Sequence, residues 1–202
     1  MDDQERIREM KRFDTDRSGD GYLAGVDEAG RGPLAGPVFA AAVVLPCDVI
    51  IDGINDSKKL SEKKREKLYD EICEKALSYS IASVDEKEID EINILQATFK
   101  AMRNAVAGLS IRPDYVLIDG NKSPGIECET GVKGDSKSMS IAAASILAKV
   151  SRDRYIVKQS EKYPGYGFEK HKGYGTKAHY DAIEKLGICP IHRKTFLRKI
   201  LD

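Results

Sequence analysis

The most informative stretch of this sequence is Tyr22-Leu23-Ala24-Gly25-Val26-Asp27-Glu28-Ala29-Gly30-Arg31-Gly32. The apolar run 22–26 predicts a short buried strand, and two adjacent carboxylates stand at its end. Because side chains alternate faces along a strand, Asp27 and Glu28 converge on one site only where the strand ends or bends. The glycines after them allow such a bend and let the backbone approach a ligand closely. Carboxylates suited to a divalent cation, next to amides and a guanidinium suited to a phosphate or sugar, therefore predict the edge of an active site.

An exposed turn whose acidic residues simply cap a strand is the alternative interpretation of this stretch. The residues that follow argue against it. Arg31 lies between two glycines, where it contributes little to packing. Residues 38–45 form a second apolar run, which we expect to pair back beside the first strand.

The composition is typical of a soluble globular protein. The chain has 202 residues, of which 41% are hydrophobic and 33% charged, enough for one well-packed domain or a domain with a small appendage. No apolar run approaches the roughly 20 residues that a membrane helix needs, and the charged N-terminus is unlike a secretory signal. The four cysteines are scattered without metal-ligand spacing, so we expect neither a zinc site nor disulfides. We therefore expect a cytoplasmic protein without membrane association.

Charge is unevenly distributed along the chain. The formal net charge is zero, which by itself counts against a nucleic-acid partner. Residues 161–202, however, contain nine Lys and Arg but only five Asp and Glu, with four tyrosines between them. Such a segment suits a surface that follows a phosphate backbone. A solvated helical face has the same composition, so the sequence leaves both interpretations open.

The remaining pattern predicts a mixed α/β layout with a helical tail. Residues 14–21 imitate the start of an EF-hand loop but lack its twelfth-position glutamate, so we interpret them as a polar turn. Residues 115–118 are continuously apolar, as in a strand buried on both faces. We expect strands over 22–26, 38–45, 80–84 and 115–118, and helices over 4–13, 61–75, from 93 to about 109, 139–158, 176–186 and 192–200.

Acidic residues lie at the ends of two predicted strands, Asp27-Glu28 and Asp119, and just before a predicted helix, Asp135. Carboxylates gathered in one place repel one another unless a cation lies between them. Ligand sets made only of oxygen favour Mg²⁺ or Mn²⁺, and two such ions about 4 Å apart activate a water and stabilise a leaving oxygen in phosphodiester hydrolysis. The three histidines lack metal-ligand spacing, and neither a Gly-x-Ser-x-Gly elbow nor a Walker lysine occurs.

Six blocks of the sequence resemble bacterial ribonuclease HII. They keep their order from Gly25 to His179 and comprise residues 25–38, 56–61, 118–121, 134–137, 141–153 and 171–179. The resemblance implies a ribonuclease H-like α/β fold, with a mixed central sheet flanked by helices and a helical C-terminal portion. It also implies a metal-dependent endonuclease that leaves 5′-phosphate and 3′-hydroxyl ends. Its implied substrates are the RNA strand of RNA–DNA hybrids and duplex DNA with an embedded ribonucleotide, which it cuts on the 5′ side of that nucleotide.

The resemblance also assigns roles to individual residues. It implies that two Mg²⁺ or Mn²⁺ ions are bound by Asp27, Glu28, Asp119 and Asp135. Asp153 competes with Asp135 as the fourth ligand, since it too lies in a family block. We favour Asp135, because an Asp inside a helix beside Arg152 and Arg154 is typical of a structural ion pair.

Substrate contacts are implied for five further residues. Gly30, Arg31 and Gly32 would recognise the ribose 2′-hydroxyl, which distinguishes RNA from DNA. Tyr174 would stack on the sugar or base beyond the scissile phosphate; without its flanking motif it would pass for an ordinary loop tyrosine. Lys58 would hold a phosphate, although a solvated surface lysine is the alternative.

The resemblance divides the chain into three parts. Residues 1–21 are expected to form a polar, helical extension, residues 22–160 the catalytic core, and residues 161–202 a helical portion that packs on the core and contacts substrate. We expect a monomer. Ribonuclease HIII is disfavoured, because only 24 residues precede Gly25 and that family lacks an arginine at the position of Arg31. A non-catalytic hybrid-binding module and another two-metal nuclease, such as an integrase or resolvase, are the rival functions.

Overall fold

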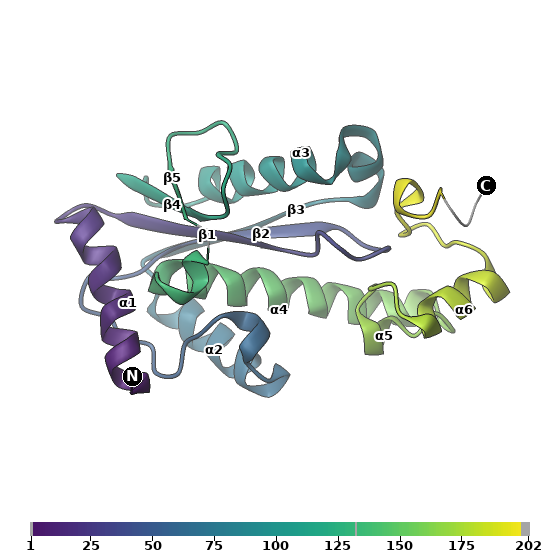
Figure 1. Ribbon diagram of the computed structural model, residues 1–202, viewed down its shortest axis with the longest axis horizontal. Helices are drawn as coiled ribbons and strands as arrows, with labels where there is room; N and C mark the ends of the chain where they lie inside the picture. Colours follow the sequence, from purple (N-terminus) through teal and green to yellow (C-terminus); the bar gives the residue numbers. More distant parts are fainter. Residues whose placement is uncertain (1, 132, 199–202) are drawn as a thin grey trace.

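A computed structural model describes residues 2–131 and 133–198, which form one mixed sheet enclosed between helices (Figure 1). The strands are β1 (Leu23–Ala29), β2 (Val38–Val44), β3 (Ser78–Val84), β4 (Tyr115–Asp119) and β5 (Glu129–Gly131). Their order across the sheet is β3-β2-β1-β4-β5. β2 is antiparallel to β1 and β3, whereas β4 is parallel to both β1 and β5. The predicted mixed α/β layout is confirmed, including the pairing of the first two strands.

Helices cover both faces of this sheet. The helix α3 (Glu86–Ala107) lies on one face, and α4 (Met139–Lys162) lies on the other, where α1 (Asp3–Ser18) and α2 (Glu62–Lys75) pack against it (Figure 1). A Cβ at Gly25 would overlap the backbone of Ser140 and Ile141, so this glycine lets α4 lie directly on β1. The face of α4 that carries Ile141, Ser145, Ala148 and Arg152 is buried.

Side-chain caps are present at two of the predicted helix starts, residues 61 and 93. Ser61 accepts a hydrogen bond from the N–H of Lys64 and begins α2, as expected. Asn93 likewise caps a helical segment, since its Oδ1 accepts from the N–H groups of Leu95 and Gln96. That segment is the second half of α3, because residues 86–92 are also helical and Asn93 forms a kink with φ of 69°. The helix therefore begins earlier than predicted.

The prediction of a polar turn over residues 14–21 was wrong for most of its length. α1 continues to Ser18, and the turn begins only at Gly19. Asp14 is buried, and its Oδ2 accepts hydrogen bonds from the N–H and the hydroxyl of Ser140, both at 2.9 Å. Ser140 lies in the first turn of α4, whose orphan N–H groups favour an acidic partner. A tertiary contact thus keeps helical a segment whose composition resembles a turn.

Two other sequence predictions need correction. β1 extends to Ala29, so Asp27 and Glu28 lie within its last three residues rather than after it. Within the predicted last helix, 192–200, the described residues 192–197 contain only the short 3₁₀ helix Lys194–Phe196, and residues 199 and 200 lie outside the described residues. β4 is buried on both faces at Leu117 and Ile118, as predicted, although Tyr115 at its start is 49% exposed. The strand β5 was not predicted at all.

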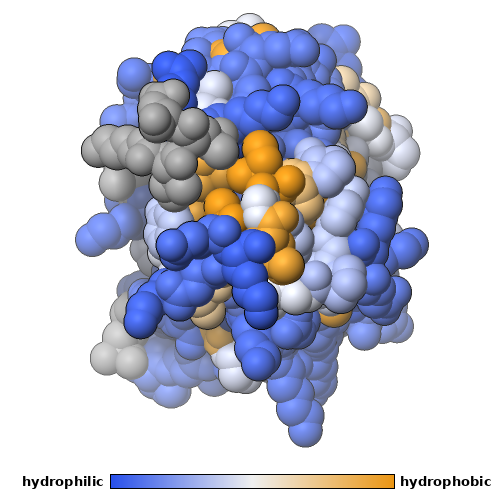
Figure 2. All heavy atoms as spheres, turned by 90° about the vertical axis from the view of Figure 1, so that its right-hand side faces the viewer, coloured by the Kyte–Doolittle hydropathy of each residue, from blue (hydrophilic) through white to orange (hydrophobic). Residues whose placement is uncertain are grey.

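The C-terminal portion packs on the far end of α4. It contains α5 (Phe168–His171) and α6 (Lys177–Leu186), the latter beginning one residue after its Thr176 cap. A separate apolar cluster joins Ile156 of α4 to Phe168, Ile183 and Leu197. Figure 2 shows this end of the molecule, where apolar side chains gather in a small patch surrounded by hydrophilic residues. Within the described ranges, no helix is both long and apolar enough to span a bilayer.

Candidate active site

Two neighbouring parallel strands bring Asp27 and Asp119 together. Val26 on β1 is paired with Ile118 on β4, so the next residue of each strand carries its carboxylate at the same edge of the sheet. One carboxylate oxygen from each of Asp27, Asp119 and Asp135 lies within 4.8 Å of the other two. The structure therefore brings three of the four predicted ligands into one cluster.

A short 3₁₀ helix, Gly134–Ser136, places Asp135 in this cluster just before α4 begins. The N–H of Gly134 donates to Asp119 Oδ1 at 2.7 Å, and this hydrogen bond holds the 3₁₀ helix against the end of β4. Asp153 lies outside the cluster. It forms an ion pair with Lys149, Nζ to Oδ1 at 2.8 Å, rather than with either of the arginines beside it.

Glu28 lies next to the cluster on the same strand edge. Its N–H donates to Asp27 Oδ1 at 2.7 Å. Its own Oε1 accepts a hydrogen bond of 3.4 Å from Nη1 of Arg31, which is half-exposed. Glu28 thus links the carboxylate cluster to the glycine-arginine-glycine stretch, residues 30–32, which we call the tip.

The cluster carries more negative charge than the surrounding protein neutralises. Burial, followed by the charges of Glu28 and Asp119, holds the pKa of Asp27 well above its ordinary value. Burial also raises the pKa of Glu28, although Arg31 opposes that shift. The pKa of Asp135 is raised to about 6, first by burial and then by Asp56 and Asp119. Mutually repelling carboxylates of this kind suit a divalent cation, and an all-oxygen ligand set favours a hard ion.

The other predicted site residues surround a hollow of about 190 Å³ beside the cluster. Tyr174 is 44% exposed, and a Cβ at Gly32 would lie 3.8 Å from its Cε1, so the tip and the tyrosine ring form adjacent walls. The residues that line the hollow are Asp27, Glu28, Ala29, Gly30, Arg31, Gly32, Ser57, Lys58, Ser145, Lys149 and Tyr174. All nine predicted site residues therefore lie in the hollow or in the carboxylate cluster that adjoins it.

Sequence reasoning missed four residues at this site: Asp56, Ser57, Ser145 and Lys149. Asp56 faces Asp135 closely enough to raise its pKa, and Ser145 donates to Ser57 Oγ at 2.8 Å. All four lie in sequence blocks that carry the family resemblance, so the blocks were the available signal. No residue-level pattern distinguished these side chains from structural ones.

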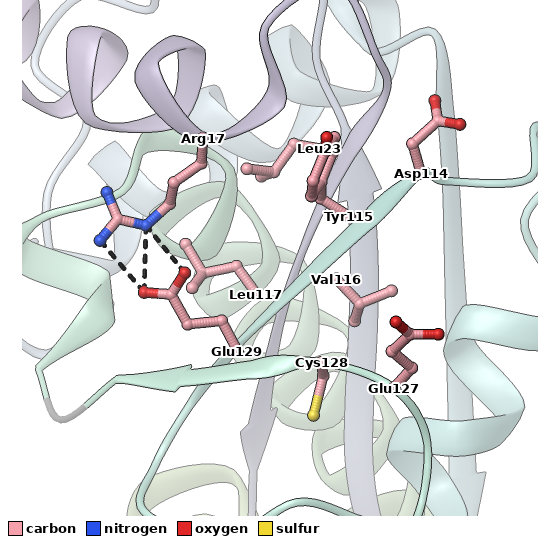
Figure 3. A pocket seen from close by; sticks show the side chains of 9 residues that line it. All are labelled: Arg17, Leu23, Asp114, Tyr115, Val116, Leu117, Glu127, Cys128 and Glu129. Carbon is pink, nitrogen blue, oxygen red and sulfur yellow. Dashed lines mark hydrogen bonds and ion pairs between the residues drawn. The ribbon is translucent and has the colours of Figure 1, made fainter.

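A larger hollow, of about 560 Å³, lies at the β4–β5 edge and is separate from the acidic cluster (Figure 3). Leu23 and Tyr115, which are paired at the start of β1 and β4, line it, so it lies toward the opposite end of these strands from Asp27. Arg17 and Glu129 meet across it in an ion pair, as Figure 3 shows. Among the residues that the structure describes, the acids that line this hollow form no group close enough to hold a metal ion, so the hollow does not compete as a metal site.

Solved structures of ribonucleases H are similar to this chain. The ribonuclease H2 of Pyrococcus horikoshii superposes with a TM-score of 0.73 at 32% identity, over 89% of this chain and 96% of that one. Ribonuclease HII in the PCNA complex of Archaeoglobus fulgidus gives 0.69 at 27% identity, over 85% and 93%. A carboxylate cluster at the edge of this sheet, in this fold, defines a metal-dependent nuclease of the ribonuclease H class.

The particular family follows from the sequence comparisons. The family model for ribonuclease HII matches residues 24–199. Ribonuclease HII of Caldicellulosiruptor bescii is 62% identical over 90% of this chain and 89% of its own length, and that of Clostridioides difficile is 56% identical over 98% and 80%. The chain belongs to the ribonuclease HII family, and it is an endoribonuclease that hydrolyses RNA in RNA–DNA hybrids. The resemblance, the ribonuclease H-like fold and the preference over ribonuclease HIII are confirmed.

Proposed function

We propose that this enzyme binds two divalent ions through Asp27, Glu28, Asp119 and Asp135, and that it cuts duplex DNA 5′ of a single embedded ribonucleotide as well as RNA in hybrids. The observation that carries the proposal is the position of the tip: it adjoins the carboxylate cluster and shares one hollow with Asp27 and Tyr174. The atoms that would hold the metal therefore lie beside the backbone that would recognise a ribose.

Mg²⁺ or Mn²⁺ fits the residues present. Every available ligand is a carboxylate oxygen, and the buried, repelling acids need a cation more than any other partner. In the arrangement we propose, Asp27, Glu28 and Asp119 would together hold the two ions, and Asp135 would complete one of the two sites. Bound metal supplies an activated water and stabilises the departing 3′ oxygen, so that the strand ends carry a 5′-phosphate and a 3′-hydroxyl.

Ribose recognition is proposed for the tip and Tyr174. The 2′-hydroxyl both donates and accepts hydrogen bonds, so backbone groups of residues 30–32 and the Arg31 guanidinium are suitable partners. The exposed ring of Tyr174 would stack on the neighbouring sugar or base. Lys58 lines the same hollow. Its charge partly opposes the rise in the pKa of Glu28 and of Asp135, so it lies near the cluster, where it would hold a phosphate.

The biological setting follows from this chemistry. Since a single chain supplies every residue of the site, we propose that the enzyme acts as a monomer, and we place it in the cytoplasm. Its role would be the removal of misincorporated ribonucleotides and RNA primers. The division into an N-terminal extension (1–21), a catalytic core (22–160) and a C-terminal substrate-contacting portion (161–202) is part of the same proposal.

A matched pair of duplexes tests the proposal. One is all DNA, and the other differs by a single 2′-hydroxyl; both are incubated with Mg²⁺ or Mn²⁺ and, separately, with chelator. We expect one cut, immediately 5′ of the ribonucleotide, only with metal. Equal cutting of both duplexes would indicate a different two-metal nuclease, and binding without a cut would indicate a non-catalytic module.

A further inference from the structure

Arg193 is a fully buried arginine whose partners are backbone carbonyls of the loop that carries the tip. Its side chain is 0% exposed, and among the described residues it forms no ion pair with a carboxylate. Its guanidinium donates to the carbonyl oxygens of Gly30 at 2.6 Å, Arg31 at 2.9 Å, Pro33 at 2.9 Å and Gly36 at 2.8 Å. Burial of a charge is costly, and Glu86 and Asp90 act on this charge without forming an ion pair with it, so the four hydrogen bonds are the direct contacts that hold the guanidinium there.

Backbone contacts join the same two segments. Residue His192 forms an isolated antiparallel bridge with Ala35. The N–H of Arg193 donates to Leu34 O at 2.8 Å, and the N–H of Gly36 donates to Ile191 O at 2.8 Å. Loop 30–36 is therefore hydrogen-bonded to residues 191–193 by main chain and side chain together.

The neighbouring His192 reaches the other wall of the hollow. Its Nδ1 accepts the N–H of Cys189 at 2.9 Å, so its Nε2 carries the proton and donates to Nε2 of His179 at 3.0 Å. Nδ1 of His179 is then protonated and donates to the carbonyl of Tyr174 at 2.9 Å. Nδ1 of His192 also lies 3.2 Å from the carbonyl oxygen of Cys189, which accepts the N–H of His192. The hydrogen bonds from Cys189 through His192 and His179 end at the backbone of the proposed stacking tyrosine.

A direct contact between the two walls completes the arrangement. The N–H of Leu34 donates to the carbonyl of Gly173, next to Tyr174, at 2.8 Å. Residues 189–193 thus support loop 30–36 through Arg193 and the Tyr174 loop through His192, while the two loops also hold each other. Displacement of either support changes the spacing between the tip and the tyrosine.

We infer that Arg193 and His192 are positioning residues that set the ribose specificity of this enzyme. The inference rests on the proposed recognition of the 2′-hydroxyl by the tip. Hydrogen bonds to one hydroxyl group depend steeply on distance and angle, and a misplacement of about 1 Å in a reacting complex costs about 10²-fold in rate. The guanidinium of Arg193 donates two hydrogen bonds to the tip, at Gly30 and Arg31, and two to Pro33 and Gly36 in the loop behind it, and this rigid fork of donors prevents such movement.

Arg193→Lys tests the inference, because lysine keeps the charge but not the fork of donors. The assay measures kcat and KM for a duplex with one ribonucleotide, and Ki for the same duplex in all-DNA form as a competitor. We expect KM for the ribonucleotide duplex to rise and kcat/KM to fall at least about tenfold, while Ki stays within about twofold, since nonspecific phosphate contacts are unaltered. Mere loss of folded enzyme would lower apparent kcat and move neither KM nor Ki. Arg154→Lys is the matched control: this exposed arginine pairs with Glu66 outside the hollow, so KM, kcat and Ki should not change.

His192→Phe tests the second support and decides the matter if Arg193→Lys does not fold. The variant keeps a ring against Tyr166 and Phe168 but removes the donor to His179. It should lower kcat/KM for the ribonucleotide duplex with Ki unchanged. Folded variants with wild-type kcat/KM would overturn the inference. Arg31→Ala distinguishes failure of the proposed function from failure of this inference. If Arg31→Ala keeps the ribose preference, the proposed role of the tip is wrong. If Arg31→Ala loses the preference but Arg193→Lys and His192→Phe keep it, only the positioning role is refuted.

Discussion

The N–H of Gly134 donates to Oδ1 of Asp119 across a distance of 2.7 Å. This hydrogen bond joins the end of β4 to the 3₁₀ helix that carries Asp135, and it orients the Asp119 carboxylate. Oδ1 of Asp119 accepts this structural hydrogen bond, and the same carboxylate group also belongs to the cluster with Asp27 and Asp135. Segments distant in sequence therefore converge because a carboxylate that would bind metal is also a backbone acceptor.

Asp27→Asn should abolish cleavage and raise the stability of the metal-free protein. Asparagine keeps the size of the side chain but removes a buried charge that repels Glu28 and Asp119. We expect turnover to fall by at least about 10³-fold, because several kcal/mol of charge stabilisation depend on the metal. Affinity for the hybrid should change little, since the contacts to phosphates remain. Single-turnover cleavage, gel-shift affinity and thermal unfolding in chelator measure the three effects, and wild-type turnover would remove Asp27 from the mechanism.

Asp135→Asn and Asp153→Asn should have opposite consequences. The first change should reduce turnover by about 10- to 100-fold, less than Asp27→Asn, because Asp135 completes only one ion's site. The second should leave turnover near wild type and lower the free energy of unfolding by about 1–3 kcal/mol, since it weakens the charged hydrogen bond from Lys149. Cleavage assays and chemical denaturation of the same preparations compare them. Loss of turnover in Asp153→Asn alone would show that the fourth ligand is misassigned.

Divalent metal should stabilise the fold, and acid should remove that effect. A ligand at 100 times its Kd adds about 2.7 kcal/mol to the free energy of unfolding. Because the pKa of Asp135 is about 6, protons compete with metal there as the pH falls through that value. Thermal unfolding with Mn²⁺ and with chelator, over a pH series, should show a difference that shrinks below about pH 6. The same series on Asp27→Asn should show little stabilisation at any pH.

The strand ends made most of the site predictable from sequence. Asp27 and Asp119 each follow an apolar run, and parallel strands deliver such residues to one edge of a sheet. The role of Arg193 was not predictable, because in the sequence it is one of nine cations in a basic segment. A count of charges does not distinguish a solvated arginine from a buried one that binds four carbonyls. Only the return of the C-terminal chain to loop 30–36 gives it that role.

Local composition misled where tertiary contacts dominate. Asp14 was assigned to a turn because acids, serine and glycine surround it, yet it is buried against Ser140 and keeps α1 helical. Asp56 was overlooked for a related reason. Its carboxylate accepts the N–H of Lys58, an ordinary capping contact, and its second role, facing Asp135, depends on a loop 79 positions further along, from 56 to 135.

Gly25→Ala should destabilise the protein severely. The added methyl group would overlap the backbone of Ser140 and Ile141, which cannot move aside as a flexible side chain does. We expect a loss of about 3 kcal/mol or more in the free energy of unfolding, at the upper end of overpacking effects, and a displaced α4. Gly131→Ala is the control, because nothing lies within 4 Å of a Cβ at that position. Chemical denaturation of both variants measures the effect, and equal stability would contradict the close packing of α4 on β1.

The hydrogen-bonded histidine chain should make part of the stability depend on pH. Burial lowers the pKa of His179 to about 4 from 6.5, so between these values the unfolded chain binds a proton that the folded protein does not. Stability is therefore lost as the pH falls below about 6.5, by about 2 kcal/mol between pH 7 and pH 5. The raised pKa values of Asp27 and Asp135 act in the opposite direction, but they are shared by wild type and His179→Phe. The variant should consequently lose about 2 kcal/mol less than wild type over that interval in urea unfolding, because its ring takes up no proton in either state. Identical losses would mean that His179 is not held neutral, and that the tautomers assigned from Cys189 to Tyr174 are wrong.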